Sequence, residues 1–267
     1  MNFFDALPDQ YRLILCDIWG VVHDGVNLHP DAANRLLQWR GEGRTIVLIT
    51  NAPRTAEAVE QQLRRLGLPR DAWDQISTSG EAGIAALNAL GQPVGFIGTK
   101  DDREILEGRG VVIAEGNDFS ELAATGLDDE RRHVADYVAQ LEDLAARDVV
   151  MHCLNPDRVV VRGGETEPCA GALADVYMGF SGRIEWYGKP FPAIYRHALA
   201  LAGNPPASDV LAIGDALRTD MLGAAKMGFD AIFVAGGIHA GEQFPPDFGP
   251  ENGLGDWEPV AVVDSLG

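Results

Sequence analysis

The sequence has few basic residues for its length. It holds 21 Lys and Arg residues against 40 Asp and Glu residues, which gives a formal net charge of −19 at pH 7 over 267 residues. A protein that binds nucleic acid needs a basic face to displace the counterions of the phosphate backbone. We therefore expect no nucleic-acid partner. A small anionic ligand would need local positive charge from a metal ion, a placed lysine or a helix N-terminus.

Cysteine is also scarce, and long apolar runs are missing. The three cysteines, Cys16, Cys153 and Cys169, are widely spaced and form no Cys-X-X-Cys pair, so we expect neither a disulfide framework nor a zinc site. No apolar run approaches the roughly 20 residues that a membrane-spanning helix requires. The first ten residues, MNFFDALPDQ, carry two acids and no basic cluster, which is not typical of a signal peptide. We expect a cytoplasmic protein that has no membrane partner.

Short apolar runs alternate with helical patterns toward both ends of the chain. Strand-like runs cover residues 13–16, 45–49, 210–213 and 231–235, and helical patterns cover residues 30–38, 55–66, 192–201 and 219–227. This alternation is typical of βαβ units around a parallel sheet, whose strands are apolar because both faces are covered. The sequence therefore predicts the α/β fold class.

The middle of the chain contains a second set of alternating elements. Helical patterns cover residues 81–90, 101–107 and 134–147, and strand-like runs cover residues 94–98, 111–113 and 149–154. One sheet of five or six strands would be crowded by all of these elements, so we expect an inserted domain. The predicted division is a core domain of residues 1–79 and 184–267 and an inserted α/β domain of residues 80–183. Residues 236–258, rich in Gly and Pro, are expected to form mostly loop.

Polar residues follow four strand-like segments, at the ends where open α/β sheets bind their ligands. They are Asp17, Thr50 with Asn51, Lys189 and Asp215. An aspartate can attack phosphorus and form an aspartyl-phosphate if the charge of the transferred group is neutralised. The two aspartates offer the hard oxygen ligands that Mg²⁺ prefers. The lysine, the threonine hydroxyl and the backbone N–H groups around Asn51 can hold phosphate oxygens.

Four segments, in this order along the chain, resemble the motifs of the haloacid dehalogenase (HAD) superfamily of hydrolases. They are LILCDIWGVVHDG (13–25), LITNAPR (48–54), YGKP (187–190) and GDALRTDMLGA (214–224). Weaker matches are STSGEA (77–82), NPD (155–157) and PCAGAL (168–173). The chain is most similar to the class IIA, p-nitrophenylphosphatase-like branch, over nearly its whole length. The resemblance implies a Rossmann-like core with a parallel sheet and an inserted α/β cap domain of the C2 type, which closes over the substrate.

The resemblance also implies roles for the residues that bind phosphate. Asp17 would be the nucleophile, and Thr50 would bind the transferred phosphoryl group. Asn51 would orient the loop that follows Thr50 and bind phosphate with it. Lys189 would neutralise both the nucleophile and the phosphate.

The metal that the resemblance implies is Mg²⁺. Its ligands would be the side chains of Asp17 and Asp215 and the backbone carbonyl of Trp19. Asp220, in the same motif as Asp215, would support the site without binding the metal directly.

Trp19 departs from the family pattern. Phosphatases of this superfamily usually have a second aspartate two residues after the nucleophile, which protonates the leaving oxygen and later activates water. A tryptophan can do neither. His23 and Asp24, in the turn that follows, are candidates to supply the proton instead. Haloacid dehalogenases carry an aromatic residue at this position, and they work without metal.

Three functions stay open at this point. The first is a Mg²⁺-dependent phosphatase of small phosphorylated metabolites, acting through an aspartyl-phosphate on Asp17. The second is a dehalogenase-like hydrolase that uses the same Asp17 on carbon. The third is a catalytically weak protein that binds a phosphorylated ligand. The sequence names no substrate, and it leaves open whether the chain forms a homo-oligomer.

Overall fold

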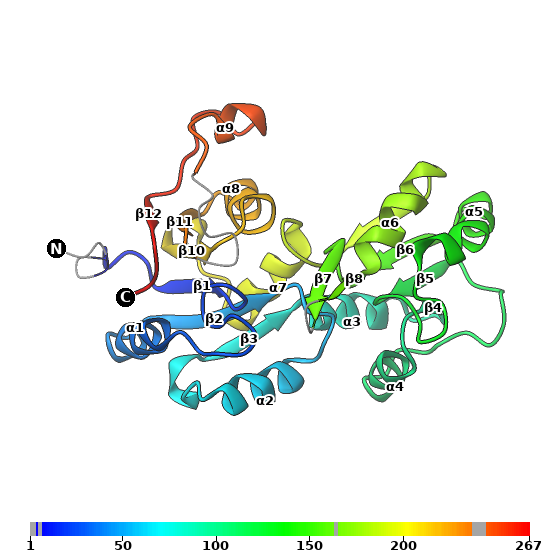
Figure 1. Ribbon diagram of the computed structural model, residues 1–267, viewed down its shortest axis with the longest axis horizontal. Coiled ribbons are helices and arrows are strands. Elements are labelled where there is room, and N and C mark those ends of the chain that lie inside the picture. The colour runs from blue at the N-terminus through cyan, green and yellow to red at the C-terminus, as the bar shows by residue number, and fades with distance from the viewer. Residues whose placement is uncertain (1–3, 5–6, 163–164, 237–243) are drawn as a thin grey trace. The chain divides into compact units, whose positions relative to one another are not determined.

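The computed structural model describes residues 4, 7–162, 165–236 and 244–267, and the chain divides into two compact units. Unit 1 comprises residues 1–50, 56–77 and 189–267, and unit 2 comprises residues 51–55 and 78–188. Each unit has its own parallel sheet, and each has its own hydrophobic core (Figure 1).

Unit 1 is built around a six-stranded sheet with the order β12-β11-β10-β1-β2-β3. Its strands are β1 (Leu13–Asp17), β2 (Thr45–Thr50), β3 (Gln75–Thr78), β10 (Val210–Gly214), β11 (Asp230–Val234) and β12 (Ala261–Val263). Strand β1 pairs in parallel with both β2 and β10, and all five of its residues are buried. The chain order runs outward in both directions from β1, so the β1/β10 junction is the topological switch point at which such sheets bind ligands.

Helices flank this sheet and bury its strands. They are α1 (Pro30–Gly41), α2 (Ala56–Leu66), α7 (Pro192–Leu201), α8 (Leu222–Met227) and the short α9 (Phe248–Glu251), with 3-10 turns at Arg70–Ala72 and Ala207–Asp209 and a π-helical turn at Leu217–Met221. Helices α1 and α7 begin with a proline, which suits the first turn because the N–H that it lacks would have no partner there. Leu15 of β1, Ile194 of α7 and Phe233 of β11 share one core.

Unit 2 contains a four-stranded sheet with the order β4-β5-β6-β9, all pairs parallel, and a separate hairpin β7-β8. The strands are β4 (Gly95–Ile97), β5 (Glu121–Ala124), β6 (Val150–Cys153), β7 (Val159–Arg162), β8 (Glu165–Pro168) and β9 (Arg183–Trp186). The helices are α3 (Ser79–Leu90), α4 (Lys100–Gly108), α5 (Val138–Ala146) and α6 (Ala170–Gly179), with a 3-10 turn at Val134–Tyr137. Tyr137, Met151 and Tyr177 lie in its core.

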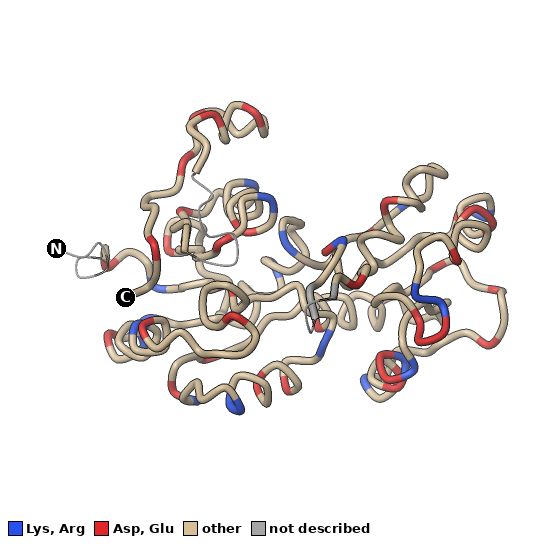
Figure 2. Tube along the Cα trace, in the orientation of Figure 1, with Lys and Arg blue, Asp and Glu red and all other residues tan. Residues whose placement is uncertain are grey.

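The helices carry charged residues between their apolar positions. Figure 2 shows acidic positions spread over the helices and loops of both units, with basic positions interspersed. Within the described ranges, no helix is long and apolar enough to cross a membrane.

The α/β class and the parallel sheet predicted from the sequence are confirmed, but several elements of unit 2 differ, and β7, β8 and α6 were not predicted. The strand predicted at 111–113 is wrong, because Ile113 forms only an isolated bridge with Val94. Strand β5 was not predicted, since its sequence ELAA contains two alanines, which have low strand propensity. Tertiary pairing between β4 and β6, rather than local preference, makes this segment a strand.

The predicted domain boundaries also differ from the observed units. The core was expected to resume at residue 184, but β9 pairs with β6, so the chain stays in unit 2 through Gly188. Unit 2 also takes in residues 51–55 and begins its main segment at Thr78, two residues before the predicted insertion. Of the predicted C-terminal loop 236–258, residues 237–243 lie outside the described residues, and α9 interrupts the rest.

Candidate active site

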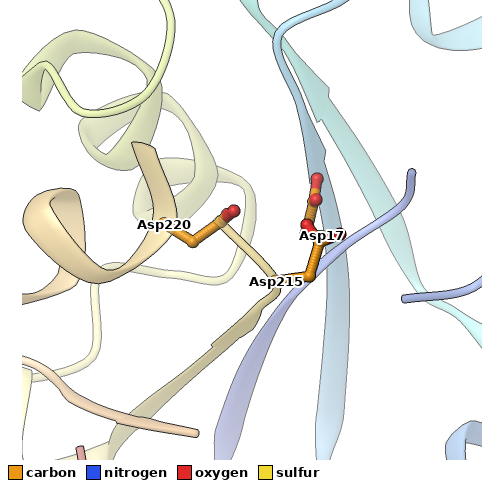
Figure 3. A group of neighbouring side chains, drawn as sticks. All are labelled: Asp17, Asp215 and Asp220. Carbon is orange, nitrogen blue, oxygen red and sulfur yellow. The ribbon is translucent and has the colours of Figure 1, made fainter. Parts of the chain in front are cut away.

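Three buried aspartates meet at the C-terminal edge of the unit 1 sheet. Asp17 is the last residue of β1, Asp215 follows β10 directly, and Asp220 lies in the π-helical turn. One carboxylate oxygen of each residue lies within 4.8 Å of those of the other two. Figure 3 shows the three side chains together beyond the strand ends. We refer to Asp17, Asp215 and Asp220 as the carboxylate cluster.

Lys189 joins two members of this cluster. Its Nζ donates to Asp17 Oδ1 at 2.6 Å and to Asp220 Oδ1 at 2.7 Å, and the side chain is 4% exposed. Burial by itself lowers the pKa of Lys189, but Asp17 and Asp220 outweigh burial and raise that pKa well above its ordinary value. The amine is therefore charged, and it draws Asp220 and Asp17 together.

The cluster carries more negative charge than this lysine neutralises. Burial and the charge of Asp220 raise the pKa of Asp17 well above its ordinary value, although Lys189 opposes them. Three carboxylates facing one ammonium in a buried site are costly, because the interior solvates an uncompensated charge poorly. A divalent cation would balance the excess, and carboxylate oxygens are the ligands that Mg²⁺ and Ca²⁺ prefer. These residues therefore fit a divalent metal ion.

A glycine allows the turn after β1 to approach the cluster. Gly20 has φ of +88°, and a Cβ there would lie 2.0 Å from Asp215 Oδ2, so only glycine fits. The turn is closed by two backbone hydrogen bonds of 2.8 Å, from Gly20 N to His23 O and from Val22 N to Ile18 O. The backbone beside Trp19 is therefore held against the Asp215 carboxylate.

The Trp19 indole stands partly in solvent, with 39% of the residue exposed. It meets the His23 ring edge-on, with centroids 5.4 Å apart, and a Cβ at Gly25 would lie 2.5 Å from its Cη2 atom. His23 is buried, and its Nδ1 accepts from Gly25 N at 2.9 Å. Because burial lowers the pKa of His23, the imidazole is neutral and carries its proton on Nε2.

Asp24, the other candidate proton donor, is used by the turn itself. Its Oδ1 accepts from Asn27 N at 2.6 Å and from Val26 N at 2.9 Å. These hydrogen bonds lower the pKa of Asp24 to about 2. An ionised carboxylate has no proton to donate, and a neutral imidazole donates one poorly, so neither residue in this state replaces the missing acid.

The two predicted phosphate-binding residues at the end of β2 fall in different units. Thr50 ends β2 in unit 1, and its neighbour Ile49 pairs with Asp17, so the threonine lies at the same sheet edge as the carboxylate cluster. Asn51 belongs to unit 2, where its Nδ2 donates to Asp157 Oδ1 at 2.9 Å. Asn51 thus bonds to the last residue of the NPD segment, a contact that was not predicted from the sequence.

One buried side chain near the cluster was not predicted from the sequence. Tyr195 of α7 is 1% exposed, and its hydroxyl donates to Thr219 O at 3.4 Å. Burial and the charge of Asp220 raise the pKa of Tyr195. A Cβ at Gly223 would lie 2.0 Å from the Tyr195 hydroxyl, so the glycine in the fourth motif makes room for this ring. That glycine is the signal that could have indicated a close neighbour there.

Comparison with known proteins places this geometry in a family. The family model described as haloacid dehalogenase-like hydrolase matches residues 14–112, and a HAD-hydrolase-like model matches residues 186–267. The chain is 30% identical over 231 residues to the ribonucleotide monophosphatase NagD of Escherichia coli K12, covering 84% of this chain and 88% of that protein. It is 23% identical over 260 residues to the 5′-nucleotidase YutF of Bacillus subtilis 168, covering 96% of each.

Solved structures agree with the sequence comparison. A crystal structure of a haloacid dehalogenase-like family hydrolase from Brucella suis 1330 shares 34% identity with this chain, covers 98% of each chain and superposes with a TM-score of 0.81. The two chains thus share both sequence and fold over nearly their full length. The chain therefore belongs to the haloacid dehalogenase-like hydrolases, class IIA.

Proposed function

We propose that this enzyme is a Mg²⁺-dependent phosphatase that hydrolyses small phosphorylated metabolites through an aspartyl-phosphate on Asp17. The observation that carries the proposal is the buried carboxylate cluster with Lys189 at the switch point of the unit 1 sheet. Two relatives, from Escherichia coli and Bacillus subtilis, are named for the hydrolysis of nucleotide phosphate esters, which supports the same reaction class.

In the first step a carboxylate oxygen of Asp17 attacks phosphorus, and the bond from phosphorus to the leaving oxygen breaks. In the second step water attacks the phosphorus of the aspartyl-phosphate, which releases inorganic phosphate and restores Asp17. Lys189 donates a hydrogen bond to Asp17, which favours the ionised carboxylate against the effect of burial, and it offers positive charge to the phosphate oxygens. The Thr50 hydroxyl, at the same sheet edge, offers a further donor, so charge that develops in the transition state meets groups already in place.

Asp17, Asp215 and the backbone carbonyl of Trp19 would hold the metal ion. When bound, the ion supplies positive charge against the transferred phosphoryl group. Asp220 acts differently, because its Oδ1 accepts from Lys189 and its Oδ2 from Ala216 N at 3.3 Å. It holds the lysine in the orientation that Asp17 requires.

The absence of an aspartate at position 19 restricts the leaving groups that we expect. A leaving oxygen of low basicity departs without being protonated, whereas an alkoxide needs an acid. Aryl and acyl phosphates should therefore be better substrates than sugar or other alkyl phosphates.

Trp19 is also the observation that favours the second candidate, a dehalogenase-like hydrolase in which Asp17 attacks carbon. Hydrolysis in ¹⁸O-water under single-turnover conditions distinguishes the two. Water that attacks an aspartyl-phosphate at phosphorus places the label in inorganic phosphate. Water that attacks an aspartyl ester at its carboxyl carbon places the label in Asp17. A protein that only binds a phosphorylated ligand labels neither.

A screen of phosphate release from a panel of phosphate esters, with and without Mg²⁺, tests the proposal. We expect release from aryl and acyl phosphates that depends on Mg²⁺ and is lost in Asp17→Asn. If wild-type protein releases no phosphate from any ester, even one with an aryl leaving group, the phosphatase proposal is wrong.

A further inference from the structure

Two segments of unit 2 that lie next to phosphate-binding residues in the sequence contact each other. Asn51 directly follows Thr50, and Gly188 directly precedes Lys189. A Cβ at Gly188 would lie 2.6 Å from Asn51 Oδ1, so the glycine backbone is packed against the Asn51 side chain. The chain passes from one unit to the other between Thr50 and Asn51 and again between Gly188 and Lys189. We call these two points crossings. They are joined through Asn51.

The turn that follows β6 holds this junction in place. Asp157 Oδ1 accepts the hydrogen bond from Asn51 Nδ2 at 2.9 Å, and Asp157 N donates to Asn155 Oδ1 at 3.2 Å. Pro156 of this turn lies beside the same face of Gly188, where a Cβ would be 2.4 Å from the proline Cγ atom. Asn51 is 7% exposed and Asn155 is 9% exposed. In so buried a place the loss of a hydrogen-bond partner is costly.

Other contacts in unit 2 fix each crossing separately. Ser79 Oγ donates to Asn51 O at 2.7 Å, which holds the first crossing by its backbone. The Tyr187 hydroxyl lies 2.7 Å from His152 Nδ1, which holds the second crossing one residue before Gly188. The bond from Asp157 differs from these, because it orients the side chain that lies between the two crossings.

We propose that Asp157 is a positioning residue for the reaction at Asp17. By holding the Asn51 amide between the 155–157 turn and Gly188, it keeps Thr50 and Lys189 at the spacing that one phosphoryl group requires. This inference rests on the proposed phosphatase function. Asp157 would act through Asn51, and a misplacement of about 1 Å at binding groups can cost about 10²-fold in rate.

Three variants test the inference, with aryl phosphate as substrate and Mg²⁺ present. Asp157→Ala removes the acceptor and should lower kcat about 10- to 100-fold, with a smaller change in KM. Asp157→Asn keeps an acceptor oxygen and should restore most of the rate. The control is Asp175→Ala, which should leave kcat unchanged. It breaks an exposed ion pair beside the same turn, in which Arg158 Nη2 lies 2.9 Å from Asp175 Oδ1.

A double-mutant cycle shows whether Asp157 acts through Asn51. In an Asn51→Ala background, Asp157→Ala should change kcat by less than about 2-fold, because the bond is already absent. Asn51→Ala alone breaks the same bond from the other side and serves as the test if Asp157→Ala fails to fold. Independent, additive effects of the two substitutions, or wild-type kcat in Asp157→Ala, would overturn the inference. Absence of phosphate release by wild-type protein would instead overturn the proposed function.

Discussion

The two units of this protein both bury polar side chains, but they balance the charges differently. In unit 2, His152 is hydrogen bonded on both ring nitrogens, to Tyr187 and to Glu121, each at 2.7 Å. In unit 1, the carboxylate cluster shares Lys189 and retains an excess of negative charge. Polar groups that satisfy each other stabilise a fold. A buried excess of like charge does not, so it indicates a site that receives an ion or a reacting group.

Substitution of the nucleophile in the carboxylate cluster should have the largest effect on activity. Asp17→Asn replaces a carboxylate with an amide that cannot attack phosphorus, so kcat should fall by about 10³-fold or more. Circular dichroism should be unchanged, because the volume of the side chain is kept. Asp9→Asn, at an exposed position of unit 1, is the control and should have wild-type kcat. Activity above a few per cent of wild type in Asp17→Asn would rule out the covalent mechanism.

Trp19 should shape how rate depends on the leaving group. Without a positioned acid, which typically contributes about 10² to 10⁴ in rate, log kcat/KM should fall steeply as the pKa of the leaving group rises. Trp19→Asp should flatten that slope and raise turnover of alkyl esters, if the void left by the indole does not misplace the turn. A flat slope in the wild type would show that another group already supplies the proton.

Metal binding should reverse the energetic cost of the carboxylate cluster. Without metal, Asp215→Ala should melt at a higher temperature than wild type, because one of the repelling carboxylates is gone. With Mg²⁺ at 100 times its Kd, wild type should gain about 2.7 kcal/mol and become the more stable protein. Thermal unfolding with and without Mg²⁺ measures both. Equal shifts in the two proteins would exclude Asp215 as a ligand.

The paired polar groups of unit 2 should respond in the opposite way, because removing one of them lowers the stability of the protein, whereas removing a carboxylate of the cluster raises it. His152→Phe should destabilise the protein by about 1 to 3 kcal/mol, because the buried Tyr187 hydroxyl loses its partner. The double variant His152→Phe/Tyr187→Phe should recover part of that loss. Both should keep the wild-type melting shift with Mg²⁺. Loss of that shift would mean that the polar groups of the two units are not independent.

The sequence was sufficient to predict that Asp17 and Asp215 lie together, but not what surrounds them. Asp17 and Asp215 could be predicted because each follows an apolar strand, and parallel strands end at one edge of a sheet. That Lys189 pairs with Asp220 as well as Asp17 depends on how the π-helical turn is packed. The bond from Asn51 to Asp157 joins residues 106 positions apart, and no local pattern could reveal it.

The most direct test of the account is to detect the phosphorylated enzyme. Because Trp19 also leaves the second step without its usual base, water should attack the aspartyl-phosphate slowly, and the intermediate should accumulate. We predict that acid quenching of a reaction with aryl phosphate and Mg²⁺, followed by mass spectrometry, shows one phosphoryl group on the peptide that contains Asp17, and none in Asp17→Asn. Phosphate release at a measurable rate with no modified Asp17 peptide at any quench time would contradict the account.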